Sequence, residues 1–245
     1  TNLQPRLISK RSPTQLQRIK REVWIMKFGS ITTGIIADGL VFNMDPANRA
    51  SYPKTGTIVN DTINRVSSGS LESDPTFAED IAFNYDGIDD YMLVGPIVSL
   101  SGNFTLSWWY KNTSGGTPSG YRNFIGGGNA LSYGCTLNGG VWKTYTAGAP
   151  TWEPMSDSVI DGNWYNLTVV NDNSNTNWTS YQNGQFFKTF TLDYSSTTLT
   201  RIGCRSNQSR FMLGSIGTVY AYNRILSSTE VLHNYNALKG RFGLT

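Results

Sequence analysis

The stretch FTLSWWYKN, residues 104–112, decides the fold class of this 245-residue chain. Its large apolar side chains occupy alternate positions: Phe104, Leu106, Trp108 and Tyr110. Successive side chains of a β-strand point to opposite faces, so this spacing predicts a strand with one apolar face. Thr105, Ser107, Trp109 and Lys111 fall on the other face.

Similar strand-like segments recur from residue 39 to residue 226. They occupy residues 39–45, 81–95, 122–128, 133–139, 141–148, 164–172, 179–190, 199–206 and 211–226. Within TSYQNGQFFKTF, the Asn183-Gly184 pair is the strongest short-range signal for a hairpin turn. About a dozen short strands separated by turn signals predict an all-β fold, a two-sheet antiparallel jelly-roll sandwich.

The composition agrees with a β protein. Charged residues make up 15% of the chain, against about 25% in typical soluble domains. The 25 glycines suit tight turns, and the 31 aromatic residues suit pleated surfaces. All-β domains of this length are common as single units, so we expect one domain and no interior linker.

The positive charge is concentrated at the N-terminus. Residues 1–30 contain seven basic residues and one acidic residue, a net charge of +6, and the other 13 basic and 16 acidic residues give −3. A faintly acidic body lacks the continuous basic face that nucleic-acid binding requires. We therefore expect no nucleic-acid partner.

Residues 1–30 are predicted to form a basic anchoring arm, with the sandwich domain spanning 31–245. Ser12, Pro13 and Gln15 mark the start of an amphipathic helix. Its apolar stripe could meet its own domain, a neighbouring subunit or a membrane surface. We favour protein, because Trp24 is the helix's only interfacial aromatic residue. The predicted partner-binding residues are Arg6, Lys10, Arg11, Leu16, Arg18, Ile19, Lys20, Arg21, Val23, Trp24, Met26 and Lys27.

The closing segment, residues 222–245, predicts a helix after the last strand. Ser227 and Glu230 form a capping box, and Gly240 is placed to end the helix. Its apolar stripe consists of Val231, Leu232, Tyr235 and Leu238. Such a helix can cover an open end or edge of a sandwich, which otherwise exposes unpaired backbone groups.

Three stretches resemble the laminin-G-like, concanavalin-A-like jelly-roll superfamily. They are GLVFNMDPANRASYPKTGT (39–57), FNYDGIDDYMLVG (83–95) and GSIGTVYAYNRILSSTEVLHNYNALKGRFGL (214–244). The ending NYNALKGRFGL also resembles structural proteins of tailed bacteriophages. This resemblance implies a virion structural protein, a capsid decoration protein anchored to the phage head by its arm and assembled in the host cytoplasm. Its partners would be the major capsid protein, other virion subunits or further copies of the chain.

Asp86, Asp89 and Asp90 form the candidate metal site. Three carboxylates in one turn repel one another unless neutralised, and hard oxygen ligands suit Ca²⁺. The resemblance implies Ca²⁺ here, although Gly217 stands where relatives often carry an acidic residue. The alternative is an Asx-type turn whose side chains cap backbone amides. No cofactor is expected to be required.

Four tryptophans are candidates for carbohydrate binding: Trp109, Trp142, Trp152 and Trp178. An exposed indole could stack on a sugar ring, whereas tryptophans of a sandwich mostly fill its core. Trp109 stands out because it falls on the face opposite the apolar one. These residues support the alternative function, a carbohydrate-binding lectin-like module of a tail or adsorption structure that binds surface glycans.

Catalysis is disfavoured. A jelly-roll glycoside hydrolase needs two carboxylates facing each other across a cleft. Neither LESDP (71–75) nor FAEDIAF (77–83) provides alternating carboxylates on one strand face, and His233 lies in the closing helix. We expect a non-enzymatic protein, with hydrolysis as the third hypothesis.

Cys135 and Cys204 do not follow a zinc-binding spacing. Buried free thiols are the favoured interpretation, with a disulfide as the alternative. The sequence shows neither a run of 18 apolar residues nor a signal-peptide core, so it favours neither a membrane span nor secretion.

Overall fold

A computed structural model describes residues 34–245, apart from 64–66, 114–121, 127–135, 139, 146–151, 160–161, 174–176 and 192–195. These residues belong to one compact unit, Thr32–Thr245. The predicted arm, with all its partner-binding residues, lies outside them. None of the helices in the described part is long and apolar enough to cross a membrane.

The largest sheet has eight strands. Seven follow the order β15-β14-β13-β7-β17-β5-β4, and β1 also pairs with β17. The strands are β1 (Leu40–Met44), β4 (Thr76–Ala78), β5 (Ala82–Asp86), β7 (Phe104–Asn112), β13 (Trp164–Asp172), β14 (Asn177–Gln182), β15 (Gln185–Thr191) and β17 (Leu213–Tyr222). All their pairings are antiparallel.

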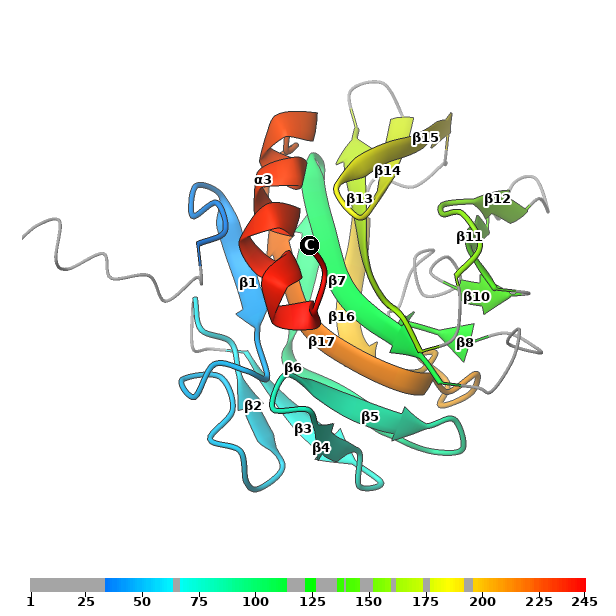
Figure 1. Ribbon diagram of the computed structural model, residues 1–245. Helices are drawn as coiled ribbons and strands as arrows, with labels where there is room; N and C mark the ends of the chain where they lie inside the picture. Colours follow the sequence, from blue (N-terminus) through cyan, green and yellow to red (C-terminus); the bar gives the residue numbers. More distant parts are fainter. Residues whose placement is uncertain are drawn as a thin grey trace, which may run out of the picture. The chain divides into compact units, whose positions relative to one another are not determined.

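Two smaller antiparallel sheets complete the sandwich (Figure 1). The five-stranded sheet contains β2 (Ile58–Asn60), β3 (Ser68–Glu72), β6 (Tyr91–Ser101), β16 (Ser196–Ile202) and β9 (Ile125–Gly126), in that order. The four-stranded sheet contains β12 (Trp152–Pro154), β11 (Val141–Tyr145), β10 (Thr136–Asn138) and β8 (Arg122–Asn123). The predicted all-β jelly-roll sandwich is confirmed.

Strand β7 divides two apolar cores. The predicted apolar residues of its first face, Phe104, Leu106, Trp108 and Tyr110, are buried in the larger core together with residues of β6, β16 and β11. Trp109 lies in a second core, with residues of the closing helix. Both faces of the largest sheet are therefore covered at β7.

The hairpin β14–β15 turns where the sequence predicts. Asn183 and Gly184 both have positive φ, 52° and 73°, as a two-residue type I′ turn requires. Cys204 is a buried free thiol, and burial raises its pKa to about 12. Cys135 lies outside the described residues.

The closing helix α3 spans Ser228–Lys239 and continues into the 3₁₀ turn η1, Gly240–Phe242. Ser227 and Glu230 form the predicted capping box. Figure 1 shows α3 lying against one face of the largest sheet. The prediction that this helix covers an open end or edge of the sandwich is wrong: α3 packs on the apolar face of the largest sheet, against side chains of β7, β13 and β17.

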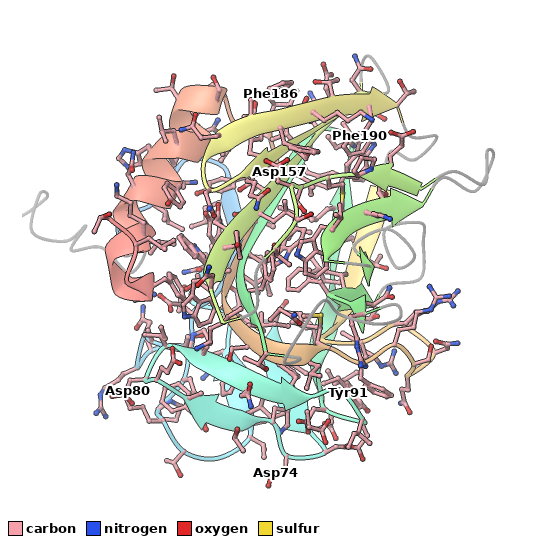
Figure 2. The ribbon with its side chains drawn as sticks, turned by 45° about the vertical axis from the view of Figure 1, so that its right-hand side comes forward. Asp74, Asp80, Tyr91, Asp157, Phe186 and Phe190 are labelled. Carbon is pink, nitrogen blue, oxygen red and sulfur yellow. The ribbon has the colours of Figure 1, made fainter. Side chains whose placement is uncertain are left out.

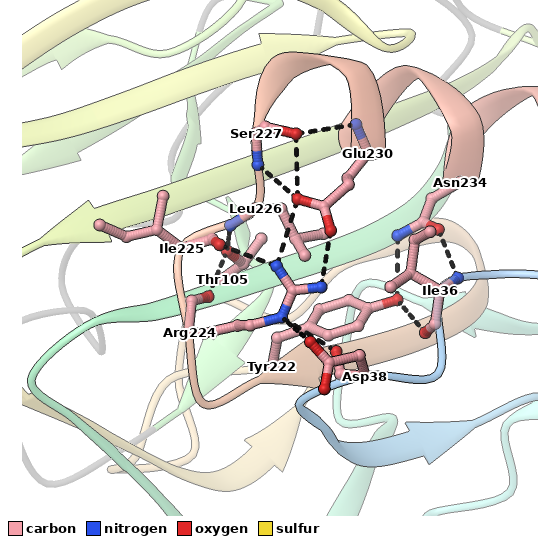
Figure 3. A network of polar contacts seen from close by, with 10 residues as sticks. All are labelled: Ile36, Asp38, Thr105, Tyr222, Arg224, Ile225, Leu226, Ser227, Glu230 and Asn234. Carbon is pink, nitrogen blue, oxygen red and sulfur yellow. Dashed lines mark hydrogen bonds and ion pairs between the residues drawn. The ribbon is translucent and has the colours of Figure 1, made fainter.

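Polar contacts fix α3 on the sheet (Figure 3). Arg224 forms a two-pronged ion pair with Glu230, with Nη2 2.7 Å from Oε1 and Nη1 3.2 Å from Oε2. The buried Asn234 donates to the hydroxyl of Tyr222 and accepts from the backbone N–H of Ile36. The helix is thereby tied to the last strand and to the chain preceding β1.

Asp45 connects the opening stretch, residues 39–57, with the closing stretch, residues 214–244. This carboxylate is fully buried and accepts from Arg241 Nη1 at 2.7 and 2.8 Å. It also accepts from the hydroxyl of Thr218 at 3.0 Å. A buried charge needs such partners, so residues at both ends of the domain depend on one another.

Candidate functional site

The candidate site lies at one end of the sandwich, where two loops meet. We call it the loop end and define it as the β5–β6 turn (86–90), the β16–β17 loop (203–212) and Arg122 of β8. Arg122 Nη1 donates to the carbonyl oxygens of Gly87 and Phe211, both at 3.1 Å. One guanidinium thus bridges the two loops and sets their separation.

The three predicted metal-site aspartates do come together in the β5–β6 turn. Their carboxylate oxygens lie within 4.8 Å of one another. Asp86 and Asp89 are exposed, whereas Asp90 is only 4% exposed. Among the described residues, this is the only group of three or more Asp, Glu, His or Cys side chains close enough to share an ion.

Backbone amides already occupy part of this carboxylate cluster. Asp86 Oδ1 accepts from the N–H groups of Ile88 (2.8 Å) and Asp89 (3.3 Å), and Asp90 Oδ2 accepts from the N–H of Asp86 (2.8 Å). The alternative interpretation, an Asx-type turn, is confirmed by these bonds. These bonds involve one oxygen of Asp86 and one of Asp90, so Asp86, Asp89 and Asp90 could hold a hard cation through the other carboxylate oxygens of the cluster.

Electrostatics distinguish Asp90 from its neighbours. Burial raises the pKa of its carboxyl above the usual value, and the charges of Asp86, Asp89 and Asp74 raise it further. The hydrogen bond from the Asp86 amide opposes this shift. The turn therefore carries concentrated negative charge, which a cation or hydrogen-bond donors would stabilise.

Gly87 gives the turn its shape. Its φ is +80°, a conformation that side chains disfavour, and a Cβ atom there would lie 2.9 Å from the Cβ of Leu213. A glycine is therefore needed for the β5–β6 turn to lie against the start of β17.

The prediction that Trp109, Trp142 and Trp178 bind carbohydrate is wrong, because all three are fully buried. Trp109 is stacked between Tyr235 of α3 and Phe242, with ring centroids 5.6 and 4.2 Å away. A sugar cannot reach an indole whose faces are covered by protein. The side chain of Trp152 lies outside the described ones.

Trp142 and Trp178 are covered by aromatic neighbours of the larger core. The ring of Trp142 meets Tyr110 edge-on at 4.8 Å, and the ring of Trp178 meets Phe104 at 5.4 Å. The alternative interpretation, that tryptophans fill the sandwich interior, is confirmed for these two residues and for Trp109.

The loop end contains an aromatic pair that the sequence did not reveal. Tyr91, the first residue of β6, and Phe211, in the β16–β17 loop, have ring centroids 6.4 Å apart, and both are partly exposed. They are separated by 120 positions in the sequence, and no local motif links them. Only strand pairing between β6 and β16 brings them together.

A comparison with known protein families identifies the superfamily to which the chain belongs. Residues 86–232, more than half of the chain, match the model of the Concanavalin A-like lectin/glucanases superfamily. The chain belongs to this superfamily. The resemblance to this superfamily is thus confirmed, and the matched residues include part of the central stretch and part of the closing one. The match does not test the bacteriophage context.

Solved structures share the fold at low sequence identity. The binding domain of botulinum neurotoxin serotype D superposes with a TM-score of 0.57 and 15% identity, over 81% of this chain and 52% of that one. Trypanosoma rangeli sialidase in complex with sialic acid gives a TM-score of 0.62 and 17% identity, over 94% of this chain and 39% of that one. The chain therefore spans about half or less of these proteins. The comparison with curated proteins found no match.

Proposed function

We propose that this protein is a non-enzymatic, lectin-like binding domain that holds a saccharide at its loop end. The observation that carries this proposal is the convergence, at one end of a concanavalin A-like sandwich, of exposed carboxylates and partly exposed aromatic rings. Sugar recognition combines these two elements, since hydroxyl groups need hydrogen-bond partners and C–H faces need apolar surface.

Three of the described glutamates are already engaged in ion pairs, which supports a binding role over hydrolysis. Glu79 is paired with Lys111, Glu153 with Lys188, and Glu230 with Arg224. A glycoside hydrolase needs one carboxyl free to give up a proton and a second facing the sugar. The Lys111 hydrogen bond instead lowers the pKa of Glu79, which makes that group a poorer acid.

The structural neighbours are consistent with saccharide binding. One is a toxin receptor-binding domain, and another is a sialidase crystallised with sialic acid. Receptor binding and the complex with sialic acid are properties of those proteins. At such low sequence identity, only the fold can be transferred to this chain. Their relevance is that a sandwich of this kind serves binding in some proteins and accompanies catalysis in others.

A glycan array probed with the full chain tests the proposal. We expect binding to a restricted set of saccharides, and no release of reducing ends when the same protein is incubated with β-glucans. Absence of binding at millimolar saccharide would contradict the lectin-like function. Turnover of a glucan would contradict the non-enzymatic one.

A second candidate function, that of a virion structural protein, is favoured by the sequence. The ending NYNALKGRFGL resembles tailed-bacteriophage structural proteins, and residues 1–30 carry a net charge of +6. In this role the arm, residues 1–30, would bind the major capsid protein or another virion subunit, and the protein would be located on the phage head. An arm of this length can cover a standard interface of about 1,600 Å².

Deleting residues 1–30 tests this second function. We expect the truncated chain to fold and to be lost from particles. Normal incorporation of the truncated chain would contradict anchoring through the arm.

A further inference from the structure

We propose that Ile88, Tyr91 and Phe211 form a platform for a neutral saccharide at the loop end. We call these three residues the platform. This inference rests on the proposed lectin-like function and names its ligand class and contact residues. It replaces Trp109, Trp142 and Trp178, whose burial removes them from contact with any ligand.

The apolar surface of the platform is accessible. Ile88 is 72% exposed at the tip of the β5–β6 turn, the highest exposure among the large hydrophobic residues described. Tyr91 and Phe211 are partly exposed, with ring planes inclined by 42°. Arg122 holds the carbonyls of Gly87 and Phe211 on one guanidinium, which brings Ile88 and Phe211 to the same region. An apolar group rimmed by polar residues marks an interaction site.

The aromatic part of the platform is held in place before any ligand arrives. The guanidinium of Arg201 lies over the ring of Tyr91 at 5.7 Å, and its Nη1 donates to the carbonyl of Ser206 at 2.9 Å. Gln208 Nε2 donates to the Tyr91 hydroxyl at 3.4 Å. Contacts that fix a site in advance reduce the entropy lost on binding.

The surrounding polar groups match the hydroxyls of a sugar. The exposed carboxylates of Asp86 and Asp89 accept hydrogen bonds, and the exposed amides of Asn207 and Gln208 can both donate and accept. A polyol needs both kinds of partner beside an apolar surface. A purely apolar peptide face would leave these groups without partners.

The charges favour a neutral saccharide over an acidic one. Within the loop end, the three aspartates Asp86, Asp89 and Asp90 are matched by three basic residues, Arg122, Arg205 and Arg210. The carboxylates of the turn lie within 4.8 Å of one another and present negative charge. Because the positive and negative formal charges of the loop end balance, the site as a whole attracts neither cations nor anions strongly, and an uncharged polyol suits it best.

The experiment compares the wild-type full chain with two platform variants and one control. Phe211→Ala removes an aromatic face, and Ile88→Ser changes an exposed side chain that the fold does not need. The control is Phe186→Ala, because Phe186 is also an exposed phenylalanine, 62% exposed, in edge contact with a tyrosine. Figure 2 shows Phe186 and Tyr91 at opposite ends of the molecule.

Each protein is applied to an array of neutral and sialylated oligosaccharides, and the strongest ligand is titrated by calorimetry. We expect the wild type to bind neutral oligosaccharides, both platform variants to bind about tenfold more weakly, and the control to be unchanged. Thermal melts establish that each variant is folded, and Ile88→Ser carries the test if Phe211→Ala unfolds.

The outcomes separate this inference from the function on which it rests. Unchanged affinity in the folded platform variants would overturn the platform and leave the lectin-like function standing. Binding restricted to sialylated oligosaccharides would overturn the neutral ligand class. A wild-type chain that binds no oligosaccharide at millimolar concentration would overturn both.

Discussion

Trp109 and Phe242 stack face to face, with ring centroids 4.2 Å apart and planes at 11°. The stack exists because Gly217 lacks a side chain: a Cβ there would lie 2.8 Å from the Phe242 ring. The absent side chain makes room for the C-terminal aromatic ring, which seals the sheet face over Trp109.

Gly217→Ala is therefore expected to destabilise the domain. The added methyl group must displace the Phe242 ring, and overpacking of this kind costs about 1–3 kcal/mol. Urea unfolding measures the change. The matched control is Gly240→Ala, because Gly240 has φ −63° and no atom within 4 Å of the added Cβ. Equal stability of the two variants would contradict the sealing role of Phe242.

The buried ion pair of Asp45 and Arg241 gives a second prediction. Arg241→Met leaves the fully buried carboxylate of Asp45 without its cation, so the free energy of unfolding should fall by about 3 kcal/mol. Lys54→Met removes the exposed pair with Asp80, whose side chain is 72% exposed, and should cost less than about 1 kcal/mol. Similar losses in both variants would show that Asp45 does not depend on Arg241.

Glu230 is expected to make the stability of the fold depend on pH. The hydrogen bonds from Arg224, with those from Ser227, lower its pKa from 4.5 to about 2. A carboxyl whose pKa is lower in the folded state stabilises the fold above the unfolded value and loses that effect as the pH falls. Stability should therefore decline between about pH 4.5 and pH 2.

Glu230→Gln isolates this contribution. The variant should lose about 1 kcal/mol or less at pH 7, because the ion pair with Arg224 disappears while a glutamine can still accept from the Ser227 amide. Its stability should fall less steeply below pH 4.5. Glu72→Gln, in β3, serves as the comparison. An unchanged acid slope in Glu230→Gln would place the acid sensitivity elsewhere.

Cation binding at the β5–β6 turn is a further proposal, tested by thermal unfolding. If Asp86, Asp89 and Asp90 hold Ca²⁺ through their remaining oxygens, millimolar Ca²⁺ should raise the melting temperature and EDTA should reverse the effect. Asp89→Asn should abolish the shift, and Asp157→Asn, also an exposed aspartate, should retain it. A shift that persists in Asp89→Asn would locate the ion elsewhere.

Local sequence patterns predicted the fold well. The alternation in residues 104–112 correctly assigned the face of β7 that packs into the larger core, and the capping box correctly located the start of α3. The burial of Trp109 was missed because alternation reveals which residues share a face, and it does not reveal what covers that face. Here the cover is Tyr235 of α3 and Phe242, both more than 120 residues further along the chain.

The sequence could predict only the part of the site whose residues are close together along the chain. Asp86, Asp89 and Asp90 are neighbours in the sequence, so their cluster could be predicted. Tyr91 and Phe211 meet through strand pairing and a loop held by Arg122, which no sequence spacing encodes.

Chemical-shift mapping of the isotope-labelled full chain tests the central claim most directly. Titration with the neutral oligosaccharide that binds best on the array should perturb amides in residues 86–91 and 203–212, and leave those of β15 and α3 unchanged. Perturbations centred on β15 or α3, or none anywhere, would contradict a saccharide site at the loop end.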